Sequence, residues 1–418
     1  MKKFLFTQLL FGLVLSLSAQ IPANGLTTDP QGNIYIGIHA PNSLTYDELP
    51  LPISADASTY ILKLDGDGNL LDIQPIKGGA KIAGDLIYLD DSLFFVQGHF
   101  YTSGTSGANK SELVFTKLNS DLSYQSTVTQ PLPVTARPLG VAYGKNRWYT
   151  AYFEESNGNP SHYVLVGLNH RYEDRWLKTI KISQLGSMWI TNQELQVLGT
   201  YYYNLSIDGN NLSSSGVDLF LASIDEKSGK ATSLKSATSS QIFNAFACKS
   251  DANYLMCGSI LETIGDQNLT RFFVTAADED LNAVYTYFAT GGGNSEATAI
   301  CKAADGGSLA AGNFTEVIEI AKNTFASYGG QDVMLIKANE AGKPKWIKAF
   351  GSDHDDELLA VASFPDGGVI IAYQAGIKGY ANGLEHFAER GPKNGQVVLV
   401  KLDAMGKILW TKQLFGSF

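Results

Sequence analysis

Histidine is the side chain in this sequence best suited to bind a metal ion or to transfer a proton near neutral pH. Six histidines occur, and five fall in segments that we expect to be loops: His39, His99, His162, His354 and His386. Imidazoles converging on one face could ligate a metal. They come from separate stretches and none has a partner at ligand spacing, so we expect solvated histidines and no metal centre.

Two acidic stretches could offer carboxylates to a calcium ion, namely "GSDHDDE" from Gly351 to Glu357 and "DGDGN" from Asp65 to Asn69. The second begins like an EF-hand loop. That loop needs Gly at its sixth position and Glu at its twelfth, whereas Leu70 holds the sixth position and no Glu holds the twelfth. We expect polar turns and no cofactor, with calcium as the one ion left open.

The motifs of nucleophilic, metal-dependent and phosphate-binding enzymes are absent: no G-x-S-x-G, no H-E-x-x-H, no phosphate loop and no sialidase Asp-box. Glycoside cleavage needs only two carboxylates about 5 to 9.5 Å apart across a cleft. A glycan-active hydrolase or lyase is therefore the alternative function, with acids drawn from Asp353, Asp355, Glu385 and Glu389.

Aromatic side chains gather in the expected loops and form the broadest candidate binding surface. Tyr suits both carbohydrate stacking and protein interfaces, because it joins apolar area to a hydroxyl. The candidate ligand-binding residues are Tyr46, Tyr101, Tyr202, Tyr328, Tyr380, His386, Phe387 and Arg390, accompanied by Tyr201, Tyr203, Asn204 and Asn382. The competing interpretation is that many of these aromatics are buried anchors that hold loops over strand edges.

Two sets of residues recur along the sequence and reveal the strands that must position these loops. An Asp or Asn that ends a strand recurs every 50 to 64 residues, at Asp65, Asn119, Asn169, Asp225, Asp278, Asn339 and Asp403. Such a side chain accepts hydrogen bonds from the backbone of a turn. Small residues that end a different strand alternate with them, at Gly37, Gly98, Ala151, Gly199, Gly258, Gly312 and Ala372. The chain therefore consists of seven repeats.

Each repeat can be divided into four short strands, a to d, separated by Gly-, Pro- and Asn-rich turns, and helical periodicity is absent. Repeated four-stranded meanders are typical of propeller blades. We predict an all-β fold, a seven-bladed β-propeller of four-stranded antiparallel blades. After Asp403 there are 15 residues, and 17 run from Ile21 to Gly37, which together match the internal spacing. The ring should thus close without a shared blade.

Length variation is confined to the connection between strands b and c. From each small residue to its own Asx the distance is 18 to 31 residues, whereas from each Asx to the next small residue it is 30 to 34. In a meander the b to c loops and the d to a links open on one face of the ring, which we call the b–c rim. The candidate residues above belong to this rim.

The segment from Gly312 to Ala372 resembles the β-propeller repeats of bacterial secreted and envelope proteins. The matching positions are Gly312, Phe314, Gly329, Gly330, Asp332, Lys337, Asn339, Gly342, Trp346, Phe350, Gly351, Asp355, Asp356, Asp366, Gly367 and Gly368. This resemblance implies a propeller, an extracytoplasmic location and a scaffold or binding role. The hairpins "SIDEKSGKATSL" and "KLDAMGKILW" also look like quinoprotein blades, but the cofactor-binding residues of that family have no counterparts here.

The first twenty residues have the pattern of an export signal, with Lys2 and Lys3 before an apolar run and small residues up to a cleavage site near Ala19 or Gln20. We expect the propeller to occupy residues 21–418, secreted or periplasmic, with no transmembrane segment after signal removal. The formal charge of −10 becomes −12 without the two lysines. Nucleic acid is therefore not an expected partner.

Three cysteines, Cys248, Cys257 and Cys301, are too few for a disulfide framework. We expect small apolar residues packed in strands, and a bridge from Cys248 to Cys257 or Cys301 is the alternative. Taken together, the sequence predicts a non-enzymatic binding or assembly module that recognises an envelope protein or glycan through the b–c rim. The longest loop, Gln374 to Gly395, is the best single candidate for contact.

Overall fold

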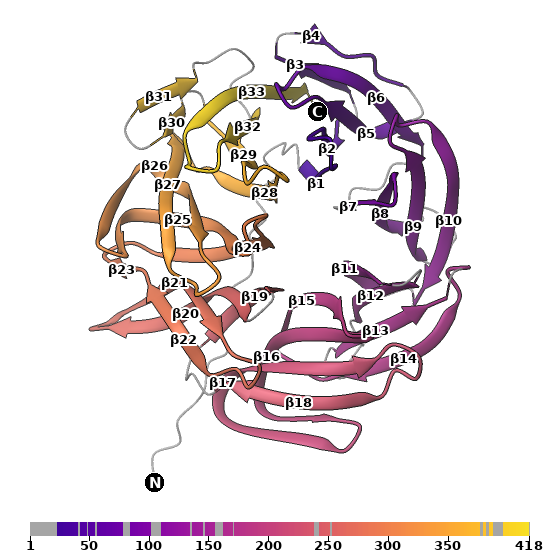
Figure 1. Ribbon diagram of the computed structural model, residues 1–418, viewed down its shortest axis with the longest axis vertical. Coiled ribbons are helices and arrows are strands. Elements are labelled where there is room, and N and C mark those ends of the chain that lie inside the picture. Colours follow the sequence, from indigo (N-terminus) through magenta and orange to yellow (C-terminus); the bar gives the residue numbers. More distant parts are fainter. Residues whose placement is uncertain are drawn as a thin grey trace.

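A computed structural model describes residues 23–417 except 41, 48, 55–56, 78–83, 102–109, 134–135, 145–146, 155–161, 170, 238–241, 251–252, 377–378, 382–383 and 388–395. Its regular structure is entirely β within these ranges, so it has no helix that could cross a membrane. Seven sheets surround a central axis (Figure 1). The predicted seven-bladed β-propeller is confirmed.

Every blade is an antiparallel meander whose first strand is innermost (Figure 1). Blades 1 to 4 comprise β1 (Ala23–Thr28), β2 (Ile34–His39), β5 (Ala57–Leu64) and β6 (Leu70–Lys77); β7 (Gly84–Leu89), β8 (Ser92–Tyr101), β9 (Lys110–Asn119) and β10 (Tyr124–Leu132); β11 (Ala136–Gly144), β12 (Arg147–Glu154), β13 (His162–Leu168) and β14 (Asp174–Ile180); and β15 (Gln184–Thr191), β16 (Glu194–Ile207), β17 (Asn210–Asp225) and β18 (Ala231–Ala237). Blades 5 to 7 comprise β19 (Ile242–Lys249), β20 (Tyr254–Ile264), β21 (Gln267–Ala277) and β22 (Ala283–Phe288); β24 (Ser295–Lys302), β25 (Ser308–Ile320), β26 (Asn323–Ala338) and β27 (Pro344–Ser352); and β28 (Glu357–Ser363), β29 (Val369–Ala375), β32 (Gln396–Leu402) and β33 (Ile408–Ser417).

The ring closes as predicted, because β1 pairs with β2 inside blade 1 and blade 7 supplies its own four strands. Three additions to this plan were not predicted. One is β23 (Thr290–Gly291), in the link after blade 5, which pairs with β25 of blade 6. The other two arise from b to c segments. The b to c segment of blade 1 forms β3 (Ser43–Tyr46) and β4 (Leu49–Pro50), and β3 pairs with β33 of blade 7. The b to c segment of blade 7 forms β30 (Gly379–Ala381) and β31 (Leu384–Phe387), and β30 pairs with β27 of blade 6. Each segment thus extends the preceding blade.

The Asp or Asn that recurs once in each repeat lies in the turn between strands c and d. In the last blade the Asp403 carboxylate accepts hydrogen bonds from the backbone N–H groups of Met405 and Lys407, both at 2.9 Å. Gly406 completes this turn with a φ of 80°, a conformation that costs glycine little. The same pattern recurs at Asp65, Asn169, Asp278 and Asn339.

Replacing Asp403 by alanine should lower the free energy of unfolding by about 1 to 2 kcal/mol, because two backbone N–H groups lose an ionised acceptor. Asp403→Asn is the matched control, since it keeps an oxygen at the same place, as Asn339 does in blade 6. Urea denaturation measures both variants. Equal midpoints for the alanine variant and the wild type would contradict this role of the side chain.

Tryptophans on three outer strands join one blade to the next. Trp176, Trp346 and Trp410 donate their indole N–H to backbone carbonyls of the following blade's c to d turn, at 3.0 to 3.1 Å. Glycine in that turn lets the indole lie close to the backbone, because a Cβ on Gly68 would be only 3.1 Å from the Trp410 indole. These tryptophans therefore pack between blades, and Trp410 does so where the two ends of the chain meet.

The three cysteines are free thiols within strands β19, β20 and β24, and Cys257 is buried. Burial raises the pKa of the Cys248 thiol to about 12 and that of Cys257 well above its ordinary value. Thiols with raised pKa values are poor nucleophiles. They behave as the small apolar residues expected from the sequence.

Candidate functional site

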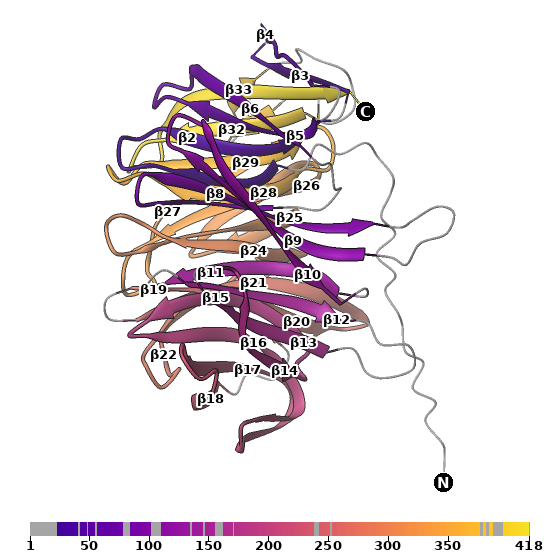
Figure 2. The same cartoon turned by 90° about the vertical axis from the view of Figure 1, so that its right-hand side faces the viewer.

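The b–c rim lies on one side of the ring, where the extended hairpins of blades 2 and 5 project (Figure 2). The candidate residues on this rim differ in how the structure presents them. Side chains are described for Tyr46, Tyr202 and Tyr328. Tyr101, Tyr380, His386 and Phe387 lie on β8, β30 and β31, where only the backbone is described, and Arg390 lies outside the described residues.

Tyr46 lies in the core instead of at the surface. Its side chain is 2 % exposed, and its hydroxyl donates a hydrogen bond of 2.5 Å to the carbonyl of Gly68. Burial, followed by the neighbouring charge of Asp47, raises the pKa of this phenol. Tyr46 therefore fits the competing interpretation, an anchor that fixes β3 against blades 1 and 7.

Tyr202 is presented to solvent together with its neighbour Tyr203. Each is 51 % exposed, their ring centroids lie 3.9 Å apart, and their hydroxyls are hydrogen-bonded at 2.8 Å. The bond to Tyr203 raises the pKa of Tyr202. The pair sits at a bulge, where the register between β16 and β17 shifts and Tyr203 adopts a φ of 61°. Tyr201, by contrast, is fully buried.

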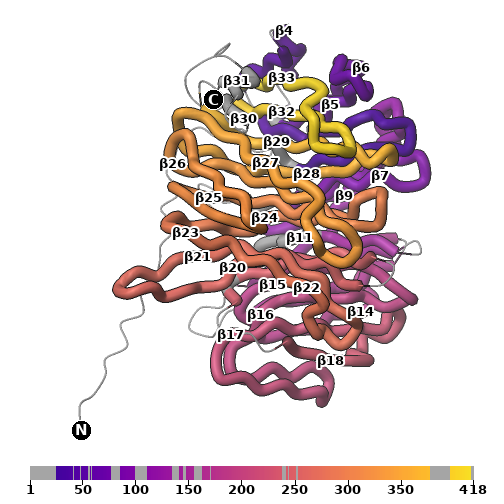
Figure 3. The backbone as a smooth tube through the Cα atoms, turned by 60° about the vertical axis from the view of Figure 1, so that its left-hand side comes forward, coloured from indigo at the N-terminus to yellow at the C-terminus, as the bar shows by residue number. Residues whose placement is uncertain are grey.

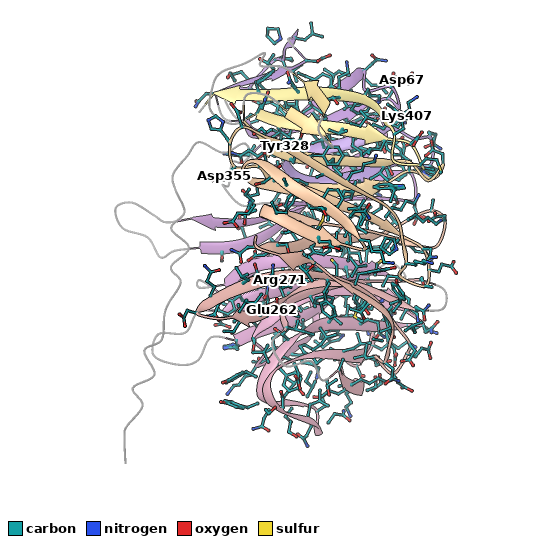
Figure 4. The ribbon with its side chains drawn as sticks, turned by 90° about the vertical axis from the view of Figure 1, so that its left-hand side faces the viewer. Asp67, Glu262, Arg271, Tyr328, Asp355 and Lys407 are labelled. Atoms are coloured by element: carbon teal, nitrogen blue, oxygen red, sulfur yellow. The ribbon has the colours of Figure 1, made fainter. Side chains whose placement is uncertain are left out.

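Tyr328 lies on the b to c hairpin of blade 6 and is partly exposed (Figure 4). Its backbone N–H donates to the Asp332 carboxylate at 2.9 Å. This contact leads to a feature that sequence reasoning missed: Asp332 and Asp356 are both 0 % exposed and interact electrostatically. Burial raises the pKa of Asp332 to about 7 and that of Asp356 to about 8.

Hydrogen bonds show that this carboxyl pair organises the backbone beneath the rim. Asp356 accepts from the Ser352 N–H at 2.5 Å, from the Ser352 hydroxyl at 2.7 Å and from the Gly376 N–H at 3.2 Å. It thereby joins the link after β27 to the start of the longest b to c loop. Because neither carboxyl reaches solvent, the pair is not placed to meet a glycan.

The acids considered for glycan cleavage are only partly described. Asp353 lies 3.0 Å from His354, and both are exposed. Asp355 accepts a hydrogen bond of 2.8 Å from the Gln331 N–H, so it joins the link after β27 to the β26 strand that carries Tyr328 (Figure 4). Only the backbone of Glu385 is described, and Glu389 lies outside the described residues.

Metal-binding clusters are absent from the described part of the chain: no three of its His, Cys, Asp and Glu side chains come together in a way that could hold an ion. In the "DGDGN" turn the Asp65 oxygens accept from the backbone of Asp67 and Asn69 and from the Asn69 amide. His162 faces Glu154 at 3.3 Å. These groups act as turn and loop contacts.

Comparison with known proteins assigns no family to the chain. No family model matches it, and no curated protein matches it in sequence. Similar solved structures include the Dos1 propeller, with a TM-score of 0.44 and 8 % identity over 96 % of this chain and 93 % of that one. The quinohemoprotein alcohol dehydrogenase of Comamonas testosteroni matches with a TM-score of 0.41 and 9 % identity over 95 % of this chain and 75 % of that one. At such values neither assigns an activity.

Proposed function

We propose that the protein is a non-enzymatic, extracytoplasmic binding or assembly module that recognises an envelope protein or glycan through the b–c rim. The observation that carries this proposal is the exposed pair Tyr202 and Tyr203. Two adjacent phenol rings offer apolar faces for stacking, on a protein or a sugar, and hydroxyls for hydrogen bonding, and Tyr is enriched at protein interfaces for this reason. Export rests on the pattern of the first twenty residues.

The backbone conformation of Tyr203 strengthens this interpretation. A bulky residue with positive φ is uncommon and costs about 1 kcal/mol or more, whereas Asn and Asp tolerate it. Blade 6 has the same bulge with Glu316 at a φ of 54°, so the bulge does not require Tyr. Tyr203 therefore combines a strained backbone with an exposed ring, and a contact with a partner explains why Tyr occupies this position.

The enzyme alternative lacks a comparable observation. The described carboxyls with the most strongly raised pKa values in the rim region, Asp332 and Asp356, are buried and engaged with the backbone. Asp353 and Asp355 are held in the exposed link after β27. A glycosidase needs an acid and a base facing one another across a substrate cleft. Of the four acids named for this role, Asp353 contacts His354 and Asp355 accepts from the Gln331 N–H.

The double variant Tyr202→Ser, Tyr203→Asn should lose at least about tenfold in affinity for the envelope partner, because both rings are removed at the centre of the contact. Asn favours positive φ, so the variant should keep the thermal midpoint of the wild type. The immobilised mature chain is exposed to envelope extract and, separately, to a glycan array, and binding is quantified for each component.

The matched control is Met405→Ser in the c to d turn of blade 7, on the opposite rim, where the side chain is 80 % exposed. This variant should bind as the wild type does. The proposal is wrong if the tyrosine variant retains every interaction, or if both variants lose binding equally.

A further inference from the structure

In three blades of this propeller the b to c segment fills an outer groove between neighbouring blades. In blade 4 the hairpin folds back after the bulge at Tyr203, and Leu205 and Ile207 become buried. Its turn residue Asp208 contacts Lys178 of β14 at 2.5 Å and the Ala231 N–H of β18 at 2.7 Å. The hairpin thus lies in the groove between blades 3 and 4.

Two other junctions are filled in the same way. In blade 6 the chain bulges at Glu316, and Ile318 and Ile320 are buried in a cluster that includes Ala289 at the end of blade 5. At the closure of the ring, β3 lies along β33, and Asp47 pairs with Lys412 at 2.6 Å. An aliphatic segment from one blade therefore covers the outer strand of the preceding blade.

Blade 5 differs from these three blades. We define its arm as residues 261–270, the outer part of the hairpin between β20 and β21. The register of these strands is continuous as far as Ile264 paired with Gln267, with no bulge. The arm is also shorter, since Ile264 follows Gly258 by six residues whereas Ile320 follows Gly312 by eight. It stands out from the ring (Figure 3), with Leu261 37 % and Ile264 50 % exposed.

A buried arginine holds the arm in this position. Arg271 is 2 % exposed, and its Nε donates to Glu262 at the base of the arm at 2.8 Å (Figure 4). Its two terminal nitrogens donate to the carbonyls of Gly293 and Gly291, at 2.8 and 2.7 Å. The arm is therefore braced against the link that follows blade 5, and it does not fold back onto its own blade.

The groove that this arm would have filled is open. Between β18 and the sheet of blade 5 lies a pocket of about 380 Å³, whose apolar lining includes Leu219, Ala237, Ile242, Met256, Phe273 and Phe288. Ala237, at the end of β18, lies beside this pocket. By register it holds the position of Ile180 in blade 3, Phe350 in blade 6 and Leu414 in blade 7. A small side chain stands here in place of the large ones of those three blades, as Ala289 does at the end of blade 5.

The arm and the groove complement one another in charge as well as in shape. Lys235 of β18 occupies the register position of Lys178, the residue that binds Asp208 in the filled groove. Lys235 is 36 % exposed and contacts Asp280, which is 77 % exposed, at 2.9 Å and the Glu279 carbonyl at 2.6 Å. Surface ion pairs of this kind contribute little stability, so an acid from another chain can replace Asp280. The arm carries an exposed acid, Asp266, two residues after Ile264, as a counterpart of Asp208.

We propose that the arm of one chain docks into the groove between blades 4 and 5 of a second copy, and that the exchange is reciprocal. In a single chain the arm contacts no groove and the groove holds no arm. In a two-fold symmetric dimer each arm fills the groove of the other copy. Ile264 then fills the pocket beside Ala237 of the other copy, and Asp266 pairs with its Lys235. This dimer is independent of the tyrosine contact proposed above.

Analytical ultracentrifugation of the mature chain across a concentration series tests the proposal. The wild type should show a reversible dimer. Ala237→Phe fills the groove with the side chain that blade 6 carries at this position, and Ile264→Ser removes the aliphatic end of the arm. Each variant should raise the dimer dissociation constant at least about tenfold. Their thermal midpoints at low concentration should match the monomeric wild type, since Phe fills a cavity and Ile264 is exposed.

Mixing the two variants provides a sharper test. The Ala237→Phe chain offers an intact arm, and the Ile264→Ser chain offers an intact groove, so the mixture should form a heterodimer more readily than either variant forms a homodimer. A wild type that stays monomeric up to about 100 µM overturns the proposal. A dimer that both substitutions leave unchanged, or a mixture no better than its components, overturns it too.

Discussion

Replacing Trp410 by alanine is expected to lower the free energy of unfolding by about 3 kcal/mol, the largest effect of a single substitution that we predict. The ring packs on Gly68 of blade 1, and its N–H donates to the Gly66 carbonyl at 3.1 Å. Lys401 donates to the same carbonyl at 2.5 Å. No peptide bond joins blade 7 to blade 1, so these contacts hold the two ends of the ring together.

Two comparisons isolate this effect. Leu409→Ala, on the neighbouring residue with a 53 % exposed side chain, should leave the urea midpoint unchanged. Trp346→Ala removes the equivalent contact between blades 6 and 7, which the chain also joins covalently. Amide hydrogen exchange should therefore increase in blades 1 and 7 for Trp410→Ala more than it does around Trp346. If both variants increased exchange equally, and only near the substituted residue, the contact of Trp410 would be no more important for stability than that of Trp346.

The second large effect concerns pH. The pKa values of Asp332 and Asp356 are raised from about 3.8 to about 7 and about 8. Between pH 4 and these values, the unfolded chain has released protons that the folded chain retains. The free energy of unfolding must therefore fall as pH rises through this window, by at most about 1.4 kcal/mol per pH unit for each carboxyl, and level off above about pH 8.

Asp332→Asn should flatten this pH dependence and stabilise the protein at pH 8 by about 2 kcal/mol or more. One Asp332 oxygen accepts from the Tyr328 N–H, and the other has no hydrogen-bond partner, so an amide can reproduce the protonated acid. Asp353→Asn, at an exposed carboxyl, is the control and should leave the pH dependence unchanged. Urea unfolding at pH 5.5 and pH 8 would refute the account if stability rose with pH or if Asp332→Asn behaved as the wild type.

The architecture could be predicted from the sequence because it depends on local constraints. An Asx side chain that closes a turn, as Asp403 does, and a small residue at the end of strand b are visible in any single repeat. Counting them yields the number of blades and the closure. The b to c segments could be recognised as variable, but not that β3 and β30 extend neighbouring blades, because that pairing is between repeats.

The site was less predictable for the same reason. Nothing in a run of three tyrosines separates buried Tyr201 from exposed Tyr202 and Tyr203; the bulge at Tyr203 decides it. In "DHDDE" the burial of Asp356 beside Asp332 depends on contacts between two blades. The one usable signal was the aliphatic alternation at Leu205 and Ile207 beyond the small residue, which indicates that strand b continues into the segment taken as a loop.

Site-specific photo-crosslinking tests most directly whether the b–c rim is the binding surface. A photoreactive phenylalanine analogue at Tyr203 is compared with the same group at Met405 on the opposite rim, in envelope extract and with the mature chain. The account predicts one dominant crosslinked envelope component, protein or glycan, from position 203 and none from position 405. Equal crosslinking from both positions, or capture only from position 405, would contradict it.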